Sequence, residues 1–473
     1  MTRPKRDAAH RKRGSTGPAR SGRRDSRRAH DAQLVLEREF SPRHLLSFSV
    51  GTYLACNAIR DAYLVVDGPD CALMRTQFLQ GNHDYLAELT SVGGKHKVVN
   101  TALEPAGVMH AREDALVDLL ARIGATDGVG CTLLTSLPLA TVLATDYARL
   151  CRRAAGRIGR PVVSIPGRSL STDWLGGYQE SLAALAAQLE LPKCRPSRNG
   201  VALVGLLHDR NEADCRGNVR ELQRLLRGLD LDPVSLWLSG GSCAELQAVA
   251  RASTIVSLPY GRKAARTLAD RLGARLVEAE LPFGLPASER FVRQVAEACR
   301  RTPQAQRWID SELAAVVPPL EWVGPFLFQE RRFGYIGDPY LRPGFRETIE
   351  LLGGRLEFSV VTACRHHLAE PSRAAPADSA ELLVEPRAAA LLRFLDERLA
   401  PDRLDCLVTN ASCIEAAAGR DFAVVEFGFP AYDAHALYDR PYLGFRGALA
   451  LVDTIANRLR LHLALRTPVA KRV

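Results

Sequence analysis

Short apolar runs alternate with amphipathic, helix-forming stretches along the chain from about residue 34 onward. In the first part of the chain, the apolar runs cover residues 62–68, 96–101, 131–136 and 161–167. Stretches rich in Ala and Leu follow at residues 112–125 and 178–191. Runs that are apolar on both faces are typical of parallel strands in a sheet that helices cover on both sides. The pattern therefore predicts a doubly wound α/β domain.

The same alternation occurs twice more. A polar break at 191–200 separates off a second unit, and a connector containing Trp and Pro near 308–325 precedes a third unit. We therefore predict an α/β fold of three consecutive Rossmann-like doubly wound parallel-sheet domains. The expected domain boundaries are 34–195, 196–310 and 311–473.

Length and composition agree with this prediction. At 473 residues the chain is too long for one ordinary core, and 47% hydrophobic with 25% charged residues is typical of a globular cytosolic protein. The longest apolar stretches fall well short of 18 residues, and the basic N-terminus is not followed by an apolar segment. We therefore expect a cytoplasmic protein with neither a membrane span nor a secretory signal. Eleven cysteines without a CxxC pair do not indicate a secreted disulfide scaffold.

The net charge of +10 is concentrated at the N-terminus. Residues 1–30 contain eleven Lys and Arg against Asp7 and Asp25, a net charge of +9, so the rest of the chain carries only +1. A segment this charged, with almost no large apolar side chains, cannot bury enough surface to offset its ordering entropy. We predict that residues 1–33 form a disordered basic tail that aids solubility or adheres weakly to polyanions. A specific nucleic-acid partner is the less favoured alternative.

Ligands of doubly wound sheets lie beyond the carboxyl ends of the strands, where the strand order switches. The segments that follow the strands therefore carry the chemical information, and they are residues 67–71, 166–171, 239–242, 337–339 and 428–433. None of them contains a GxGxxG or GKS/T phosphate loop. We therefore expect no direct binding of ATP or NAD.

Several segments resemble the nitrogenase component 1 family. AYLVVDGPDC (62–71) resembles the strand and loop that carry a cluster cysteine in that family, and PVVSIPGRSLSTDWLGGYQESLAAL (161–185) is similar to a later strand, loop and helix. The most specific piece is EFGFPAYDAHALYDRPYLGFRGALALVDTIAN (426–457), which resembles the β-type subunit of the nitrogenase molybdenum-iron protein. The resemblance extends from about residue 45 to 460. Light-independent protochlorophyllide reductase subunits share this architecture.

The resemblance implies an oxidoreductase subunit of nitrogenase-like type. Such subunits pair with a homologous component 1 subunit, as a heterodimer, heterotetramer or homodimer, and receive electrons from a separate ATP-dependent iron protein. The implied cofactor is an iron-sulfur cluster, which we expect to be a 4Fe-4S cluster shared between subunits. The absence of a phosphate loop in this chain fits a separate nucleotide-carrying partner.

Members of this family typically contribute three cysteines to the shared cluster. The middle one matches Cys71, whereas Ser47 and Pro138 occupy the positions of the other two. Four thiolates are the usual complement of a 4Fe-4S cluster, so the partner must supply most ligands, or Cys56 and Cys131 stand in from shifted positions. Both of these lie where buried, inert thiols are common. Cys71 is therefore the preferred ligand.

Other polar residues have both a chemical and a structural interpretation. His83 beside Asp84 could donate a proton to a reduced substrate, or could cap a helix or pair on the surface. CRHH at 364–367 is dense in metal-ligand side chains, but it has no second pair at zinc spacing, so a structural role is favoured. His435 could form hydrogen bonds across a subunit interface.

The sequence is consistent with three functions. The first is the reductase subunit, the second a scaffold of the same family on which a metallocofactor is assembled, and the third a cluster-free structural partner. Pro259 stands where the nitrogenase α subunit has the cysteine that holds its large cofactor, so nitrogen reduction by this chain is not expected.

Overall fold

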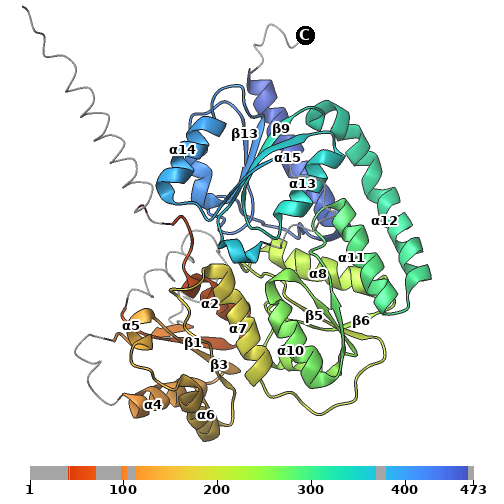
Figure 1. Ribbon diagram of the computed structural model, residues 1–473. Coiled ribbons are helices and arrows are strands. Elements are labelled where there is room, and N and C mark those ends of the chain that lie inside the picture. The colour runs from red at the N-terminus through yellow and green to blue at the C-terminus, as the bar shows by residue number, and fades with distance from the viewer. Residues whose placement is uncertain (1–40, 42, 71–96, 104–111, 369–379, 467–473) are drawn as a thin grey trace, which may run out of the picture.

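Three parallel sheets organise the chain (Figure 1). The computed structural model describes residues 41, 43–70, 97–103, 112–368 and 380–466. Every strand pairing within the three sheets is parallel, and helices surround the sheets. The predicted fold of three consecutive Rossmann-like doubly wound domains is therefore confirmed. The predicted basic tail at 1–33, together with Cys71, His83 and Asp84, lies outside the described residues.

The first sheet has the strand order β2-β1-β3-β4. Its strands are β1 (Ala62–Asp67), β2 (Val98–Asn100), β3 (Cys131–Ser136) and β4 (Val162–Ser164). Its helices are α2 (Phe48–Asn57), α4 (Glu113–Gly124), α5 (Pro138–Thr141), α6 (Tyr147–Ile158) and α7 (Trp174–Gln188). Leu64 and Val66 share a core with α2 and α7, whereas Val65 packs with α4 and α6. The apolar character of both faces thus reflects helices on both sides of the sheet.

Two glycines let α2 and α7 touch. A Cβ on Gly51 would lie 1.8 Å from the Trp174 carbonyl oxygen, and one on Gly177 would lie 2.0 Å from that of Phe48. No other residue fits at either position without displacing backbone. Helix α7 also packs against α10 (Arg262–Leu272) of the second domain, so it serves both domains (Figure 1).

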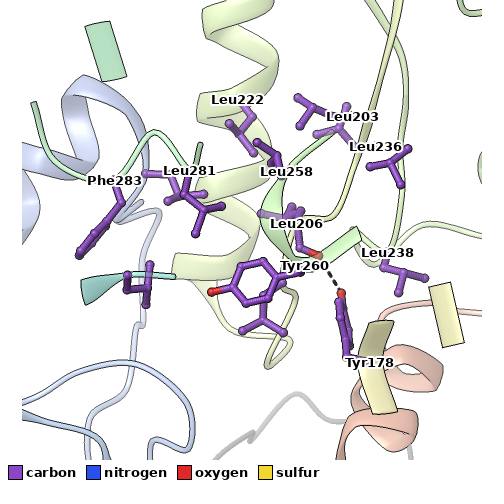
Figure 2. Close-up of a cluster of buried hydrophobic side chains, with 14 of the residues drawn as sticks. Tyr178, Leu203, Leu206, Leu222, Leu236, Leu238, Leu258, Tyr260, Leu281 and Phe283 are labelled. Atoms are coloured by element: carbon purple, nitrogen blue, oxygen red, sulfur yellow. Dashed lines mark hydrogen bonds between the residues drawn. The ribbon is translucent and has the colours of Figure 1, made fainter. Parts of the chain in front are cut away.

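The second sheet has the same kind of strand order, β6-β5-β7-β8. Its strands are β5 (Gly200–Val204), β6 (Asp232–Leu236), β7 (Thr254–Ser257) and β8 (Arg275–Glu278). Besides α10, its helical segments are α8 (Ala213–Arg227), α9 (Cys243–Gln247), η2 (Ala248–Arg251), η3 (Pro259–Gly261), α11 (Leu285–Ala298), α12 (Thr302–Val323) and η4 (Gly324–Phe328). The Tyr178 hydroxyl of α7 donates to the Leu206 carbonyl oxygen at 2.8 Å, beside buried leucines (Figure 2). One apolar core therefore runs from the first domain into the second.

The third sheet has five strands in the order β11-β10-β9-β12-β13. They are β9 (Arg332–Gly337), β10 (Arg355–Val361), β11 (Glu381–Val384), β12 (Cys406–Thr409) and β13 (Ala423–Glu426). The helical segments are α13 (Arg342–Leu351), η5 (Arg365–His367), α14 (Ala388–Arg398), η6 (Ala411–Ala417) and α15 (Gly444–Arg466). None of the helices in the described ranges combines the length and apolar character needed to cross a bilayer.

The stretch near 308–325, predicted to connect the second and third units, lies in the 22-residue helix α12 and the start of η4, and α12 continues through Pro318 and Pro319. A proline inside a helix costs about 3 kcal/mol, so the local sequence disfavours a continuous helix here. The helix persists because it buries Ile309, Val316 and Leu320 at helical spacing and packs against α11 and α15. Tertiary packing outweighs the local preference here.

Candidate cluster-binding edge of the first domain

The loops after β1 and β3 meet at the carboxyl edge of the first sheet. These strands are neighbours, and the chain leaves β1 toward β2 on the opposite side, so the strand order switches between them. The Leu137 amide donates to the Asp67 carbonyl oxygen at 2.9 Å, and a Cβ on Gly68 would lie 2.7 Å from the Leu137 Cβ. The segment Gly68 to Asp70, which leads to Cys71, therefore starts against the segment that leads to Pro138.

A buried carboxylate anchors the start of this loop. Asp67 is only 1% exposed, and its Oδ1 forms an ion pair with Arg112 and accepts a hydrogen bond from the Thr101 hydroxyl at 2.7 Å. Its Oδ2 accepts from the Tyr147 hydroxyl at 2.7 Å. Burial, reinforced by the bond to Asp67, raises the pKa of Tyr147 well above its usual range, so the phenol stays a donor. These contacts hold the residue from which the loop departs.

The two substituted family positions offer no thiolate. Ser47 directly precedes α2, and its hydroxyl lies 3.0 Å from that of Ser49. Pro138 begins α5 and has no donor atom in its side chain. The donor set of this chain at the matched positions is therefore Cys71 alone. A 4Fe-4S cluster fits these residues only if other chains supply the remaining ligands.

Cys56 and Cys131, the alternative ligands, lie at the amino edge of the sheet. The Cys56 thiol donates to the Ala62 carbonyl oxygen at 3.7 Å, and Cys131 pairs with Ala62 at the start of β3. Five residues of strand separate this edge from Asp67, or about 16 Å at the usual rise. Burial raises the pKa of Cys56 to about 12, which opposes the thiolate form that binds iron. Both thiols thus lie at the edge of the sheet opposite to residues 68–70, the described start of the segment that leads to Cys71.

The CRHH segment joins the third domain to the first. His367 Nε2 lies 2.8 Å from Asp173 Oδ1, and His366 Nε2 lies 3.2 Å from the Thr172 hydroxyl, both just before α7. The Cys364 amide donates to the second Asp173 oxygen at 2.6 Å. Across the parts of the chain that the structure describes, no group of three or more His, Cys, Asp or Glu is arranged to hold a metal ion. These contacts assign the segment a structural role.

Tyrosine side chains fill the space beyond β7, where Pro259 stands. The Tyr260 hydroxyl donates to Asp338 at 2.7 Å, and its ring meets that of Tyr340 edge to face at 4.9 Å. Burial raises the pKa of Asp338 to about 6. The carboxyl edge of the second sheet is therefore packed with this chain's own side chains at this point.

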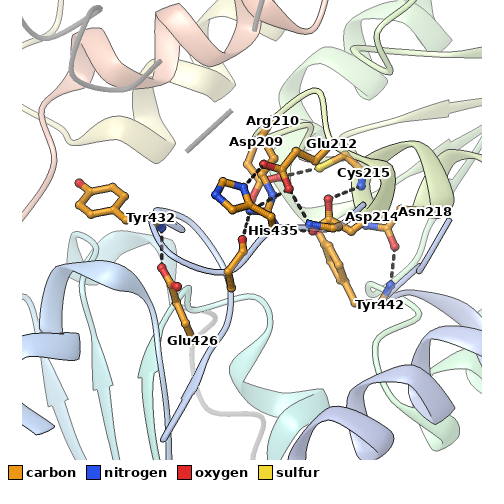
Figure 3. Close-up of polar contacts among 12 residues, drawn as sticks. Asp209, Arg210, Glu212, Asp214, Cys215, Asn218, Glu426, Tyr432, His435 and Tyr442 are labelled. Atoms are coloured by element: carbon orange, nitrogen blue, oxygen red, sulfur yellow. Dashed lines mark hydrogen bonds and ion pairs between the residues drawn. The ribbon is translucent and has the colours of Figure 1, made fainter. Parts of the chain in front are cut away.

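A buried polar cluster between the second and third domains was not anticipated from the sequence (Figure 3). Glu212 is fully buried just before α8, and its carboxylate lies 2.7 Å from His435 Nδ1 and accepts the Ala436 amide at 2.7 Å. Arg210 donates to Asp214 and to the Ala434 carbonyl oxygen, both at 2.6 Å. His435 therefore binds within its own chain. The available signal was the charged run HDRNEAD directly after the apolar run of β5.

Comparisons with known proteins agree with this architecture. The chain is 21% identical over 334 residues to the nitrogenase molybdenum-iron protein beta chain of Methanococcus maripaludis, covering 66% of this chain and 70% of that one. It is 23% identical over 264 residues to the same protein of Methanothermobacter marburgensis, covering 51% and 57%. The solved structure described as nitrogenase Cp1 at pH 6.5 superposes with a TM-score of 0.76 at 16% identity, covering 91% of this chain and 95% of that one.

The family profile described as nitrogenase component 1 type oxidoreductase matches residues 48–460, which include all three sheets. The resemblance inferred from the sequence motifs is thereby confirmed. The chain belongs to the nitrogenase component 1 type oxidoreductase family.

Proposed function

We propose that this chain is one subunit of a nitrogenase-like, iron-sulfur-dependent reductase that receives electrons from a separate ATP-dependent iron protein. The proposal is supported by the family match over residues 48–460 and by the position of the segment that leads to Cys71. That segment leaves a central strand of the first sheet, at the switch in strand order where doubly wound sheets bind their ligands.

Cys71 is the proposed ligand of this chain to a 4Fe-4S cluster. When bound, such a cluster supplies one-electron chemistry at low potential. The chain's own contribution is to hold the start of the Cys71 loop, through the buried Asp67 and its bonds to Arg112 and Tyr147. Cys56 and Cys131 are weaker candidates because they lie at the opposite edge of the sheet. His83 and Asp84 remain candidate proton donors from the sequence.

A homologous component 1 subunit is the proposed source of the other ligands. Two apolar side chains at the same edge of the first sheet are strongly exposed: Val142, which ends α5, is 81% exposed, and Leu170, in the loop after β4, is 89% exposed. Gly167 brings this loop close to β3, since a Cβ there would lie 2.5 Å from the Ser136 hydroxyl. Under a partner subunit, an exposed apolar side chain on each of two segments at this edge would be removed from water, which fits the proposed partner.

A cofactor-assembly scaffold of the same family is the second candidate. Ser47 and Pro138 favour this candidate, because they stand at positions where the family has cysteines. A chain with fewer ligands holds a cluster less firmly, which suits a scaffold that passes the cluster on. A cluster-free structural partner is the third. The scaffold would acquire metal without reducing a substrate when the iron protein and ATP are added, and the structural partner would acquire none.

Iron and labile sulfide in the anaerobically purified complex with its partner subunit test the proposal. We expect iron and sulfide in the wild-type complex and a large loss in Cys71→Ala. The variants Cys56→Ala and Cys131→Ala serve as controls, and both should keep their metal. A complex without iron, or one that keeps its full iron content in Cys71→Ala, would overturn the assignment.

A further inference from the structure

An apolar groove lies between helices of the second and third domains. Helix α12 lies at the outer edge of the molecule, and α15 packs against it and against η4 (Figure 1). A cavity of about 620 Å³, here called the α12–α15 groove, lies between these three segments. Its walls are mainly apolar, and the side chains that line it include Leu320, Val323, Leu327, Leu449, Val452 and Ala456.

Two exposed aromatic side chains stand at this groove. Trp322 is 70% exposed and Phe326 is 71% exposed, and both line the cavity. Their ring centroids are 6.1 Å apart. No other Trp or Phe in the part of the chain that the structure describes is as open to water. Neighbouring exposed aromatic rings beside an apolar cavity are typical of a protein–protein interface, where such side chains are enriched.

Helix α15 places one charge of each sign at the groove. Asp453 and Arg460 both line the cavity, and seven residues of helix separate them by about 10.5 Å along its axis. Arg460 is exposed, and within the described ranges it has neither an ion-pair nor a hydrogen-bond partner. Asp453 pairs with Arg440 at 3.0 Å, but its side chain is still 58% exposed and can accept a second cation.

This arrangement is complementary to itself. A two-fold axis over the groove, at the level of Ala456, would bring Arg460 of each copy level with Asp453 of the other. The same rotation would lay α15 of one copy over α12 of the other, where Trp322 and Phe326 stand. A shift along the helix would instead set like charges against each other, so the two charges select one register.

We propose that the α12–α15 groove binds a second copy of this chain through a two-fold axis. Trp322 and Phe326 of each copy pack against α15 of the other, and the Arg460–Asp453 pairs fix the register. The proposal does not depend on the cluster assignment. The groove belongs to the second and third domains, whereas the edge assigned to the partner subunit belongs to the first. Both surfaces can therefore be occupied together, which gives an assembly of two copies of this chain and two partner subunits.

Sedimentation equilibrium of the anaerobically purified complex with its partner subunit tests the proposal. We expect two copies of the chain per wild-type complex, with dissociation to one copy on dilution. Trp322→Glu should weaken the association of the two copies by about 30-fold or more, the loss typical of a central aromatic residue in an interface. A single copy at every wild-type concentration, or unchanged association in Trp322→Glu, would overturn the proposal.

Exchange of the two charges tests the two-fold arrangement. Arg460→Asp would set carboxylates opposite each other in both symmetric contacts, and Asp453→Arg would do the same with guanidinium groups. Each single variant should therefore associate more weakly than wild type. The double variant restores opposite charges and should recover most of the lost affinity. If it recovers none, the groove takes a different partner and the assignment to a second copy fails.

Leu392→Glu is the matched control, because Leu392 is an apolar residue of α14 that is 61% exposed and lies outside the groove. This variant should keep two copies per complex. The iron content should be the same in Trp322→Glu as in wild type, whereas Cys71→Ala should lose iron and keep two copies. The two proposals can therefore fail independently.

Discussion

Replacing Tyr147 with Phe tests whether the buried Asp67 carboxylate anchors the Cys71 loop. The substitution keeps the ring and removes only the hydroxyl that donates to Asp67 Oδ2 at 2.7 Å. Arg112 and Thr101 stay bound to Oδ1, so the carboxylate remains partly compensated. A hydrogen bond to a charged, buried group contributes roughly 1.5–3 kcal/mol. Because Tyr147 is half-buried and water can reach the vacated site, we expect a loss of about 2 kcal/mol.

The loss is measured as the difference in unfolding free energy between wild type and variant in urea. Hydrogen exchange of the backbone amides of the first domain serves as the probe of unfolding. Tyr438→Phe is the matched control, since Tyr438 is 66% exposed, and its unfolding free energy should be unchanged. The iron content of the anaerobic complex supplies a second readout, which should fall in Tyr147→Phe if the anchored loop places Cys71. A loss no larger than that of the control would refute the anchoring role of Asp67. Lower stability with unchanged iron would separate stability from cluster binding.

Three further predictions concern the packing and the buried charges. Gly177→Ala would place a Cβ 2.0 Å from a backbone oxygen of α2, so we expect the unfolding free energy to fall by more than about 2 kcal/mol. The unfolding midpoint should be lower than that of the control Gly156→Ala, because Gly156 is exposed and a Cβ there meets no atom within 4 Å. His435→Ala removes a partner of the fully buried Glu212 and should cost about 2 kcal/mol and expose the junction between the second and third domains to protease. Burial raises the pKa of Asp338 to about 6, so the folded state binds this proton more tightly than the unfolded state does. The protonated carboxyl therefore contributes to the stability of the fold at low pH, and this contribution is lost as the pH rises toward 6. Asp338→Asn should flatten that loss between pH 4 and 6, and an unchanged pH profile would contradict the assignment.

The sequence by itself determined the fold class and the family. Apolar runs at 62–68 and 131–136 coincide with β1 and β3 because a strand covered on both faces must be apolar on both, and this requirement is local. The loop that leads to Cys71 was predicted for the same reason, since in parallel sheets the ligand-binding segments follow the strands. The resemblance of the GFPAYD segment to the family is likewise carried by one continuous stretch of sequence and requires no long-range contact.

Only the tertiary structure decided which distant residues meet. Helix α12 runs through Pro318 and Pro319 because packing against α11 and α15 outweighs the local preference for a break. His435 pairs with Glu212, and the Cys243 amide donates to Asp61, because the domain junctions bring together segments more than a hundred positions apart. Periodicity reports which face of an element is buried, whereas the identity of the partner across that face depends on how three sheets dock. That information is carried by long-range packing and cannot be derived from a local pattern.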